Sequence, residues 1–190
     1  MPKLNRTQQA VAGVIYILSG IVVVLLLVSF VFRLFGSDEL GISRFFSAPF
    51  RGIFSDASIG QGSVSVYLMV AMLFYPLLAY IVMLFITSLL VLNPLRIVRG
   101  IVNALFRFVE LVLVTRFLFK VFAASIQSSF VTFIYKSTNF IPSTLSFIPT
   151  IRFSNSEFEL STFFVFGIIL IIDILVWNLF TSLLEDRNYD

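Results

Sequence analysis

Charged side chains lie inside two segments of the sequence that are mostly apolar. Asp173 stands at the middle of one such segment, and Arg107, Glu110 and Arg116 lie in another. A carboxylate at the centre of a bilayer costs about 2.5 to 3.5 kcal/mol on insertion scales, and the short Asp side chain cannot reach the membrane surface. We therefore expect these four residues to form one charge cluster, in which Asp173 is ionised and paired with Arg116 or Arg107.

Two other states of Asp173 fit the same pattern. The carboxyl group can be protonated and hydrogen-bonded to a hydroxyl or a backbone group, or it can belong to a proton or ion pathway. The three readings differ in charge, so the pattern of residues leaves them open.

The sequence holds little of the equipment that enzymes use. It has no His and no Cys, which excludes imidazole and thiolate metal ligands, thiol nucleophiles and disulfides. The acids of the two long connections follow no recognisable spacing: Asp38, Glu39, Asp56, Glu157 and Glu159. We expect no enzymatic activity, no cofactor and no metal. The 13 basic and 10 acidic residues are scattered, so we also expect no nucleic-acid partner.

One connecting segment is unusually rich in Phe. The stretch FFSAPFRGIF comprises Phe45, Phe46, Pro49, Phe50, Arg51 and Phe54 among its residues. Connecting loops are normally polar, so this one is expected to lie along the membrane interface. Its Phe side chains would enter the acyl boundary, Arg51 would reach lipid phosphate or water, and Pro49 would set the bend. Packing onto the two helices of its own half, and docking of a partner, are the alternatives.

The elements that must position these residues are membrane helices. Only 12% of the 190 residues are charged and 59% are hydrophobic, whereas a soluble domain has roughly 25% charged residues. Apolar runs of about 20 residues are long enough to cross a bilayer. The sequence therefore predicts an all-α membrane protein whose four transmembrane helices lie at about 11–35, 66–92, 100–123 and 161–184, the second kinked at Pro76.

The remaining segments connect these helices. They are the tails 1–10 and 185–190, the amphipathic interfacial loops 36–65 and 124–160, and the short connection 93–99. Basic residues are densest in the tails and the short connection, namely Lys3, Arg6, Arg96, Arg99 and Arg187. The positive-inside rule then places both termini in the cytoplasm and both long loops outside. The first apolar run is too long for a signal-peptide core and indicates an uncleaved anchor.

The two halves of the chain are similar. IVMLFITSLL, at 81–90, aligns with LVWNLFTSLL, at 175–184, and VSFVFRLF, at 28–35, aligns with VLVTRFLF, at 112–119. The sequence thus predicts two tandem repeats, 11–92 and 100–184. Each holds an even number of spans, so the repeats are parallel, related by an axis along the membrane normal.

The alignment matches Arg33 with Arg116 near the outer ends of their helices. Such side chains can snorkel to the interface, or they can hydrogen-bond loop carbonyls and fix the geometry of the loops. By contrast, Ala79 and Leu27 correspond to Asp173 and Glu110. A symmetric pore lined by both repeats is therefore disfavoured.

The order of these pieces resembles the YggT family of small bacterial and plastid membrane proteins. The resemblance covers about 11–92 and 100–184 and rests on FRLF, SAPFRGIF, VELVLVTRFLFKVFAA and FVTFIYKSTNF. In the second copy, Asn139 stands where the Pro of the APF triplet is expected and no Arg follows. The resemblance implies a non-enzymatic membrane protein, with relatives associated with osmotic tolerance, cell division or envelope organisation in bacteria, and with thylakoid or cytochrome assembly in plastids.

Two functions fit these features best. The first is a scaffold or assembly factor in a membrane, most simply the bacterial plasma membrane, whose partners are the lipid bilayer and other membrane proteins or further copies of itself. The alternative is a small oligomeric transporter or channel for ions or osmolytes, suggested by the charges within the apolar segments.

Overall fold

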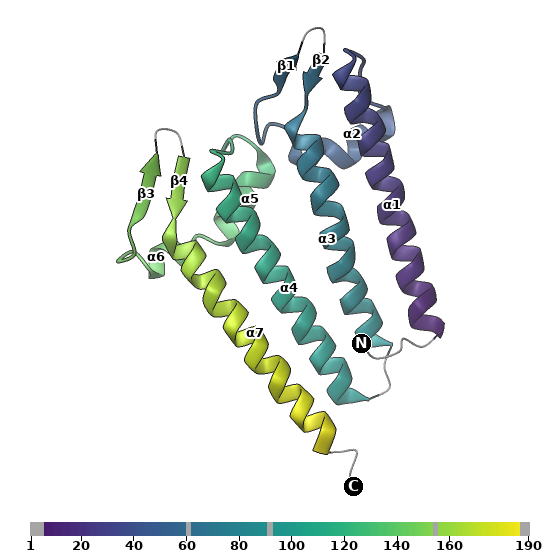
Figure 1. The fold of residues 1–190 in the computed structure, drawn as a ribbon, viewed down its shortest axis with the longest axis vertical. Helices are drawn as coiled ribbons and strands as arrows, with labels where there is room; N and C mark the ends of the chain where they lie inside the picture. The colour runs from purple at the N-terminus through teal and green to yellow at the C-terminus, as the bar shows by residue number, and fades with distance from the viewer. Residues whose placement is uncertain (1–5, 60–61, 91–92, 154–155, 187–190) are drawn as a thin grey trace.

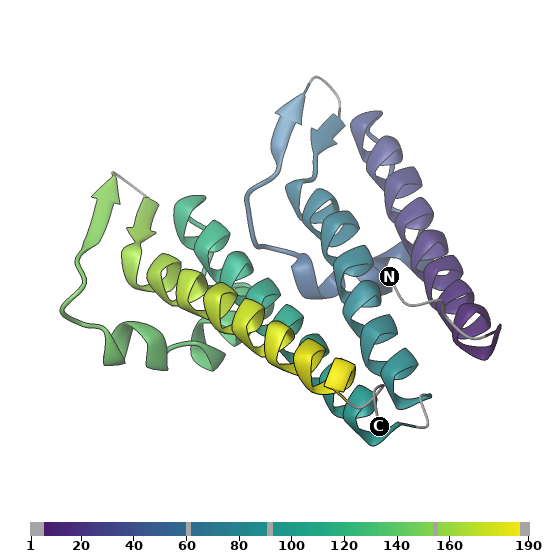
Figure 2. The same cartoon turned by 60° about the horizontal axis from the view of Figure 1, so that its bottom comes forward.

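Four long helices stand side by side in the computed structural model, which describes residues 6–59, 62–90, 93–153 and 156–186. They are α1 (Arg6–Leu34), α3 (Val66–Leu89), α4 (Pro94–Val121) and α7 (Leu160–Asp186). Helix α1 packs on α3, α3 on α4, and α4 on α7, which gives a row of four (Figures 1 and 2). The beginning of α1 and the end of α7 lie toward the same end of the helices, although these two helices are on opposite sides of the row (Figure 1).

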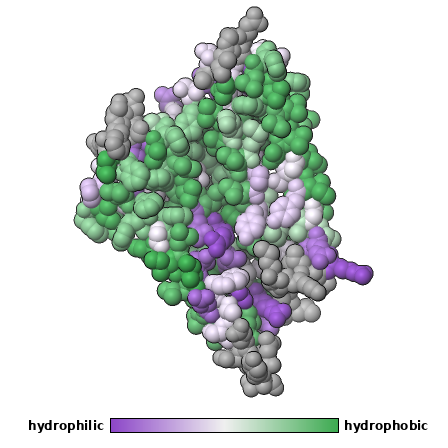
Figure 3. Space-filling view, viewed as in Figure 1, coloured by the Kyte–Doolittle hydropathy of each residue, from purple (hydrophilic) through white to green (hydrophobic). Residues whose placement is uncertain are grey.

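Three of these helices are long and apolar enough to cross a membrane, namely α1, α3 and α7. The expectation of a mainly helical membrane protein is confirmed to that extent. Many of their large apolar side chains are exposed, and Figure 3 shows one face of the molecule largely covered by hydrophobic residues. Helix α4 differs because charged residues recur along it, and it is not among the three.

Helix α4 begins at Pro94 and not near residue 100, so most of the predicted connection 93–99 is helical. The local reason is a standard N-terminus: the Asn93 side chain accepts a hydrogen bond from the Leu95 N–H at 3.0 Å, and Pro94 occupies the first turn. Hydropathy alone missed this start because the first turns of the helix carry Arg96 and Arg99.

The two long connections are folded. They lie at one end of the four helices, which we call the loop end (Figure 1). The first holds α2 (Gly41–Ser47), the short helix η1 (Ala48–Phe50) and the antiparallel hairpin β1 (Ala57–Ile59) with β2 (Gly62–Val64). The second holds α5 (Ser129–Ser137), α6 (Phe140–Thr144) and the antiparallel hairpin β3 (Thr150–Phe153) with β4 (Ser156–Glu159). The fold is therefore mostly helical and not all-α.

The core lies at the loop end, and the Phe-rich segment contributes to it. Phe50 is buried, and its ring lies 4.9 Å from that of Phe130 in α5 and 5.4 Å from that of Phe74 in α3. The expectation that Phe50 points into the acyl boundary is wrong, because η1 turns its side chain inward. Phe45, five residues earlier, is 78% exposed.

The other two Phe residues of this segment also pack on the protein. The Phe46 ring meets Tyr75 of α3 at a centroid distance of 6.0 Å, and the Phe54 ring lies 6.3 Å from that of Phe119 in α4. Aromatic pairs at these distances favour edge-to-face geometry. The segment therefore contacts helices of both halves of the chain, α3 and α4, and not only those of its own half.

At the opposite end, α3 and α4 approach very closely. A Cβ atom added at Gly100 would lie 2.0 Å from the Ser88 Cβ. Only Gly therefore fits at this crossing of the two helices.

Candidate functional site

The C-terminal turn of α1 places Arg33 at the loop end, where it binds groups from α3 and from the first long connection. Its Nη1 donates to Glu39 Oε1 at 3.0 Å and to the Tyr67 hydroxyl of α3 at 2.7 Å. Its Nη2 donates to Asp56 Oδ2 at 3.0 Å. One guanidinium group thus ties α1 and α3 to the connection that joins them.

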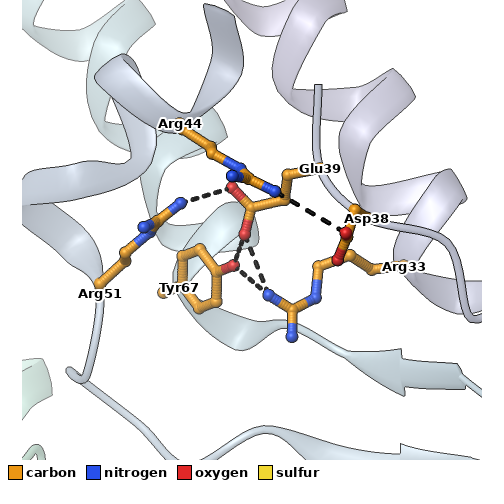
Figure 4. A pocket seen from close by; sticks show the side chains of 6 residues that line it. All are labelled: Arg33, Asp38, Glu39, Arg44, Arg51 and Tyr67. Carbon is orange, nitrogen blue, oxygen red and sulfur yellow. Dashed lines mark hydrogen bonds and ion pairs between the residues drawn. The ribbon is translucent and has the colours of Figure 1, made fainter. Parts of the chain in front are cut away.

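Glu39 is the acceptor at the centre of this group, as Figure 4 shows. Besides Arg33, its carboxylate accepts hydrogen bonds from Arg51 Nη2 at 2.9 Å, from the Ser47 hydroxyl at 3.1 Å and from the Tyr67 hydroxyl. Its side chain is only 4% exposed. We call Arg33, Glu39, Arg51, Asp56 and Tyr67 the first network.

Burial and hydrogen bonding act in opposite directions on Glu39. Burial raises the pKa of the carboxyl group, whereas the hydrogen bonds from Tyr67, Arg33 and Arg51 lower it. The hydrogen bonds prevail, so the pKa of Glu39 lies below its usual value. Glu39 is therefore an anion that holds two cations in place, and Arg51 contacts this carboxylate through Nη2 while its side chain stays 45% exposed.

A cavity of about 370 Å³ opens beside the first network. Its lining residues are Arg33, Asp38, Glu39, Arg44, Arg51 and Tyr67 (Figure 4). Among the described residues, the Arg44 guanidinium has only a long contact with the exposed Asp38, at 3.9 Å. Guanidinium groups with N–H donors to spare recognise carboxylates and phosphates, so this cavity suits the binding of an anion.

A second network surrounds Arg116 in α4. Its Nε and Nη2 donate to the two carboxylate oxygens of Glu159 at 2.6 and 2.7 Å, and its Nη1 donates to the Thr138 hydroxyl at 2.7 Å. The Thr162 hydroxyl also donates to Glu159, and the guanidinium carbon lies 5.4 Å from the Tyr135 ring centroid. We call Arg116, Thr138, Tyr135, Glu159 and Thr162 the second network.

The second network is more enclosed than the first. The Arg116 and Glu159 side chains are 4% and 7% exposed, whereas Arg33 is 30% exposed. Hydrogen bonds from Arg116 and Thr162 outweigh burial, so the pKa of Glu159 lies below its usual value. Next to it, Lys120 Nζ donates to Glu157 at 2.6 Å. Each long connection is thus held to its helix pair by an Arg and a buried Glu.

The four residues predicted as one cluster lie in two places. Arg107 donates from Nη1 to Glu110 and from Nη2 to Asp173, both at 2.6 Å. Arg116 is not part of this group, because it lies nine residues farther along α4, about 13 Å at the helical rise. We call Arg107, Glu110 and Asp173 the central triad.

Sequence reasoning missed the acids that complete both networks. Glu39 and Glu159 belong to the acids that follow no recognisable spacing, and they come 6 and 43 residues after their Arg partners. No fixed spacing could have found both. The available signal was weaker: a buried Arg at the end of a helix needs a counter-ion, and each loop offers few acids.

Comparisons with protein-family models, with curated proteins and with solved structures found no match. Proposals on the function of the chain are therefore based on its own residues and their geometry.

Proposed function

We propose that the chain is an integral membrane protein of the YggT type with four transmembrane helices, arranged as two tandem parallel repeats. Apolar helices α1, α3 and α7 support three of the spans. The position of α4 supports the fourth, because α4 packs between α3 and α7 and has a similar length. If both neighbours cross a bilayer, α4 has to cross with them.

The charges of α4 are compatible with a membrane span because the described structure pairs many of them. Arg116 and Lys120 bind acids of the loop end, and Arg107 binds Glu110 and Asp173. Charges inside a membrane are tolerated where they pair with one another in the protein interior. Basic residues are dense at the beginning of α1, at the beginning of α4 and just after α7. They favour a cytoplasmic location for both termini, as in a bacterial plasma membrane.

Within this topology we assign the role of a non-enzymatic scaffold or assembly factor. The observation that carries the assignment is the pair of Arg–Glu networks, each centred on a buried Glu, which tie both long connections to the helices at one end. The surface they support displays large exposed aromatic side chains, namely Phe35, Phe45, Phe133, Phe140 and Phe147. A folded surface with exposed apolar groups suits docking of another membrane protein or insertion at the lipid interface.

The topology can be tested with single introduced Cys residues, because the chain has none of its own. We expect Ser58→Cys to react with a membrane-impermeant maleimide from outside intact cells. Thr7→Cys, at the start of α1, should react only after the membrane is opened. Labelling of both positions from the same side of the membrane would contradict the four-span arrangement.

The scaffold role can be tested by photo-crosslinking in native membranes. A photoreactive amino acid at Phe45 should give discrete protein adducts, whereas the same group at Leu73, which is exposed on α3, should give mainly lipid adducts. Equal adduct patterns at the two positions would contradict a protein-docking role for the loop end.

A small oligomeric transporter or channel is the second candidate, and the central triad is the observation that favours it. Charged groups at the middle of membrane helices often mark ion or proton pathways. Ion flux into vesicles that contain the purified protein, and its loss in Asp173→Asn, would favour this function over the scaffold.

A further inference from the structure

The central triad lies at the middle of its two helices. Asp173 is thirteen residues from each end of α7, and Arg107 is thirteen residues from the start of α4, which is about 20 Å at the helical rise. The hydrocarbon core of a bilayer is about 30 Å thick. If the helices cross a membrane as proposed above, the triad is close to the centre of the hydrocarbon.

The triad has more negative than positive groups. Its two carboxylates share a single guanidinium, and both acids are buried, with whole-residue exposures of 8% for Glu110 and 6% for Asp173. With both acids ionised, the group would have a net charge of −1. A buried, uncompensated charge of this kind costs several kcal/mol.

Neighbouring groups in the described residues do not supply the missing positive charge. On α4, Arg116 is committed to Glu159. Arg99, two turns before Arg107, lies over the Trp177 ring at 3.7 Å and donates to the Thr181 hydroxyl. Helix α3, packed on the other side of α4, has no charged residue.

One atom of the triad is left without a partner. Glu110 Oε2 accepts from Arg107, but Oε1 is buried and has no hydrogen-bond partner among the described residues. An ionised oxygen in such a position keeps its full desolvation cost. A neutral carboxylic acid avoids the larger part of this cost.

We propose that the central triad binds one proton, carried by Glu110 on Oε1, while Arg107 and Asp173 remain an ion pair. The new bond is the O–H bond of Glu110, and the charge of the triad changes from −1 to zero. The proposal rests on the proposed function for the depth of the triad in a membrane, whereas the burial of both acids and the unpartnered Glu110 oxygen come from the fold alone. It makes the triad a proton-binding site, in which a deprotonated Glu110 would compete with Asp173 for the same guanidinium.

Infrared spectroscopy of the purified protein in lipid bilayers tests this assignment. A protonated carboxyl group has a C=O stretch that is separate from the bands of carboxylates and amides. At neutral pH we expect such a band in the native protein and its loss in Glu110→Gln. We also expect its loss in Asp173→Asn, because Arg107 and an ionised Glu110 are then neutral together. Asp38→Asn is the control, since Asp38 is a surface acid with a 98% exposed side chain, and it should leave the band unchanged.

Isotope labelling and salt exchange complete the test. Protein labelled with ¹³C at the Glu side-chain carboxyl should show the band at lower frequency, whereas an unshifted band would overturn Glu110 as the carrier. Absence of the band in the native protein would overturn the proposal. Disappearance of the band when sodium replaces choline in the buffer would also overturn it, because it would indicate that the triad binds a metal cation in place of the proton. If maleimide labelling contradicted the four spans and the band persisted, the topology would fail and the proton site would stand.

Discussion

Breaking the buried pair Arg116–Glu159 by removing one partner should strongly destabilise the loop end. Replacing Arg116 by Met keeps much of the side-chain volume and removes the charge, which leaves Glu159 without its two bonds at 2.6 and 2.7 Å. Breaking a buried pair by removing one partner costs about 3 to 5 kcal/mol. Within the described part of the chain, Glu159 would keep only the hydrogen bond from Thr162, so we expect a loss of unfolding free energy in this range.

The corresponding change in the first network should cost less. Arg33→Met leaves Glu39 with Arg51, Ser47 and the Tyr67 hydroxyl as donors, and the Arg33 side chain is itself partly exposed. The cost expected for losing a charged hydrogen-bond partner in that setting is about 1 to 3 kcal/mol. Arg44→Gln, which affects only a surface pair, is the control and should cost at most about 1 kcal/mol.

Unfolding in mixed micelles of increasing denaturing-detergent content, followed by circular dichroism, measures these differences. The double variant Arg116→Met with Glu159→Gln should be more stable than the sum of the two single losses predicts, because neither charge is then left alone. A coupling below about 0.5 kcal/mol would mean the two sites are independent. That result, or an Arg33→Met loss at least as large as the Arg116→Met loss, would refute the reasoning.

Three further predictions concern packing and pH. Gly100→Ala should destabilise the protein by about 1 to 3 kcal/mol, because the new methyl group meets Ser88 at the α3–α4 crossing, whereas Gly167→Ala, in open surroundings, should not destabilise it; thermal unfolding compares the two. Phe50→Ala should lower the free energy of unfolding by about 3 to 5 kcal/mol because its ring is buried, and Phe45→Ala should lower it little. Equal losses in detergent unfolding would contradict the inward orientation of the Phe50 side chain. Finally, the Glu carboxyl groups of both networks have pKa values below the ordinary value in the folded state, so the stability they contribute is present above an unfolded pKa of about 4.3 and is lost as the pH falls through the folded-state values. A pH series of melting temperatures should show this acid loss, and it should be smaller when both acids are replaced by Gln.

Several features of this protein follow from local sequence. Apolar runs of sufficient length predicted helices that α1, α3 and α7 represent, because hydropathy and length are properties of a single segment. The need of Asp173 for a partner also follows from local sequence, because the cost of an isolated charge inside an apolar segment is independent of the rest of the fold. The start of α4 was also readable from Asn93 and Pro94, although hydropathy obscured it.

Tertiary structure decided which groups meet. Asp173 could be paired from sequence with either Arg116 or Arg107, and the depth and rotation of α4 against α7 selected Arg107. Both network acids come from connections whose path no spacing rule describes. The same holds for two Phe residues five positions apart, one buried and one exposed. Hydropathy depends on neighbours along the chain, whereas pairing and burial depend on neighbours in space, and those exist only once the four helices and two folded connections have packed together.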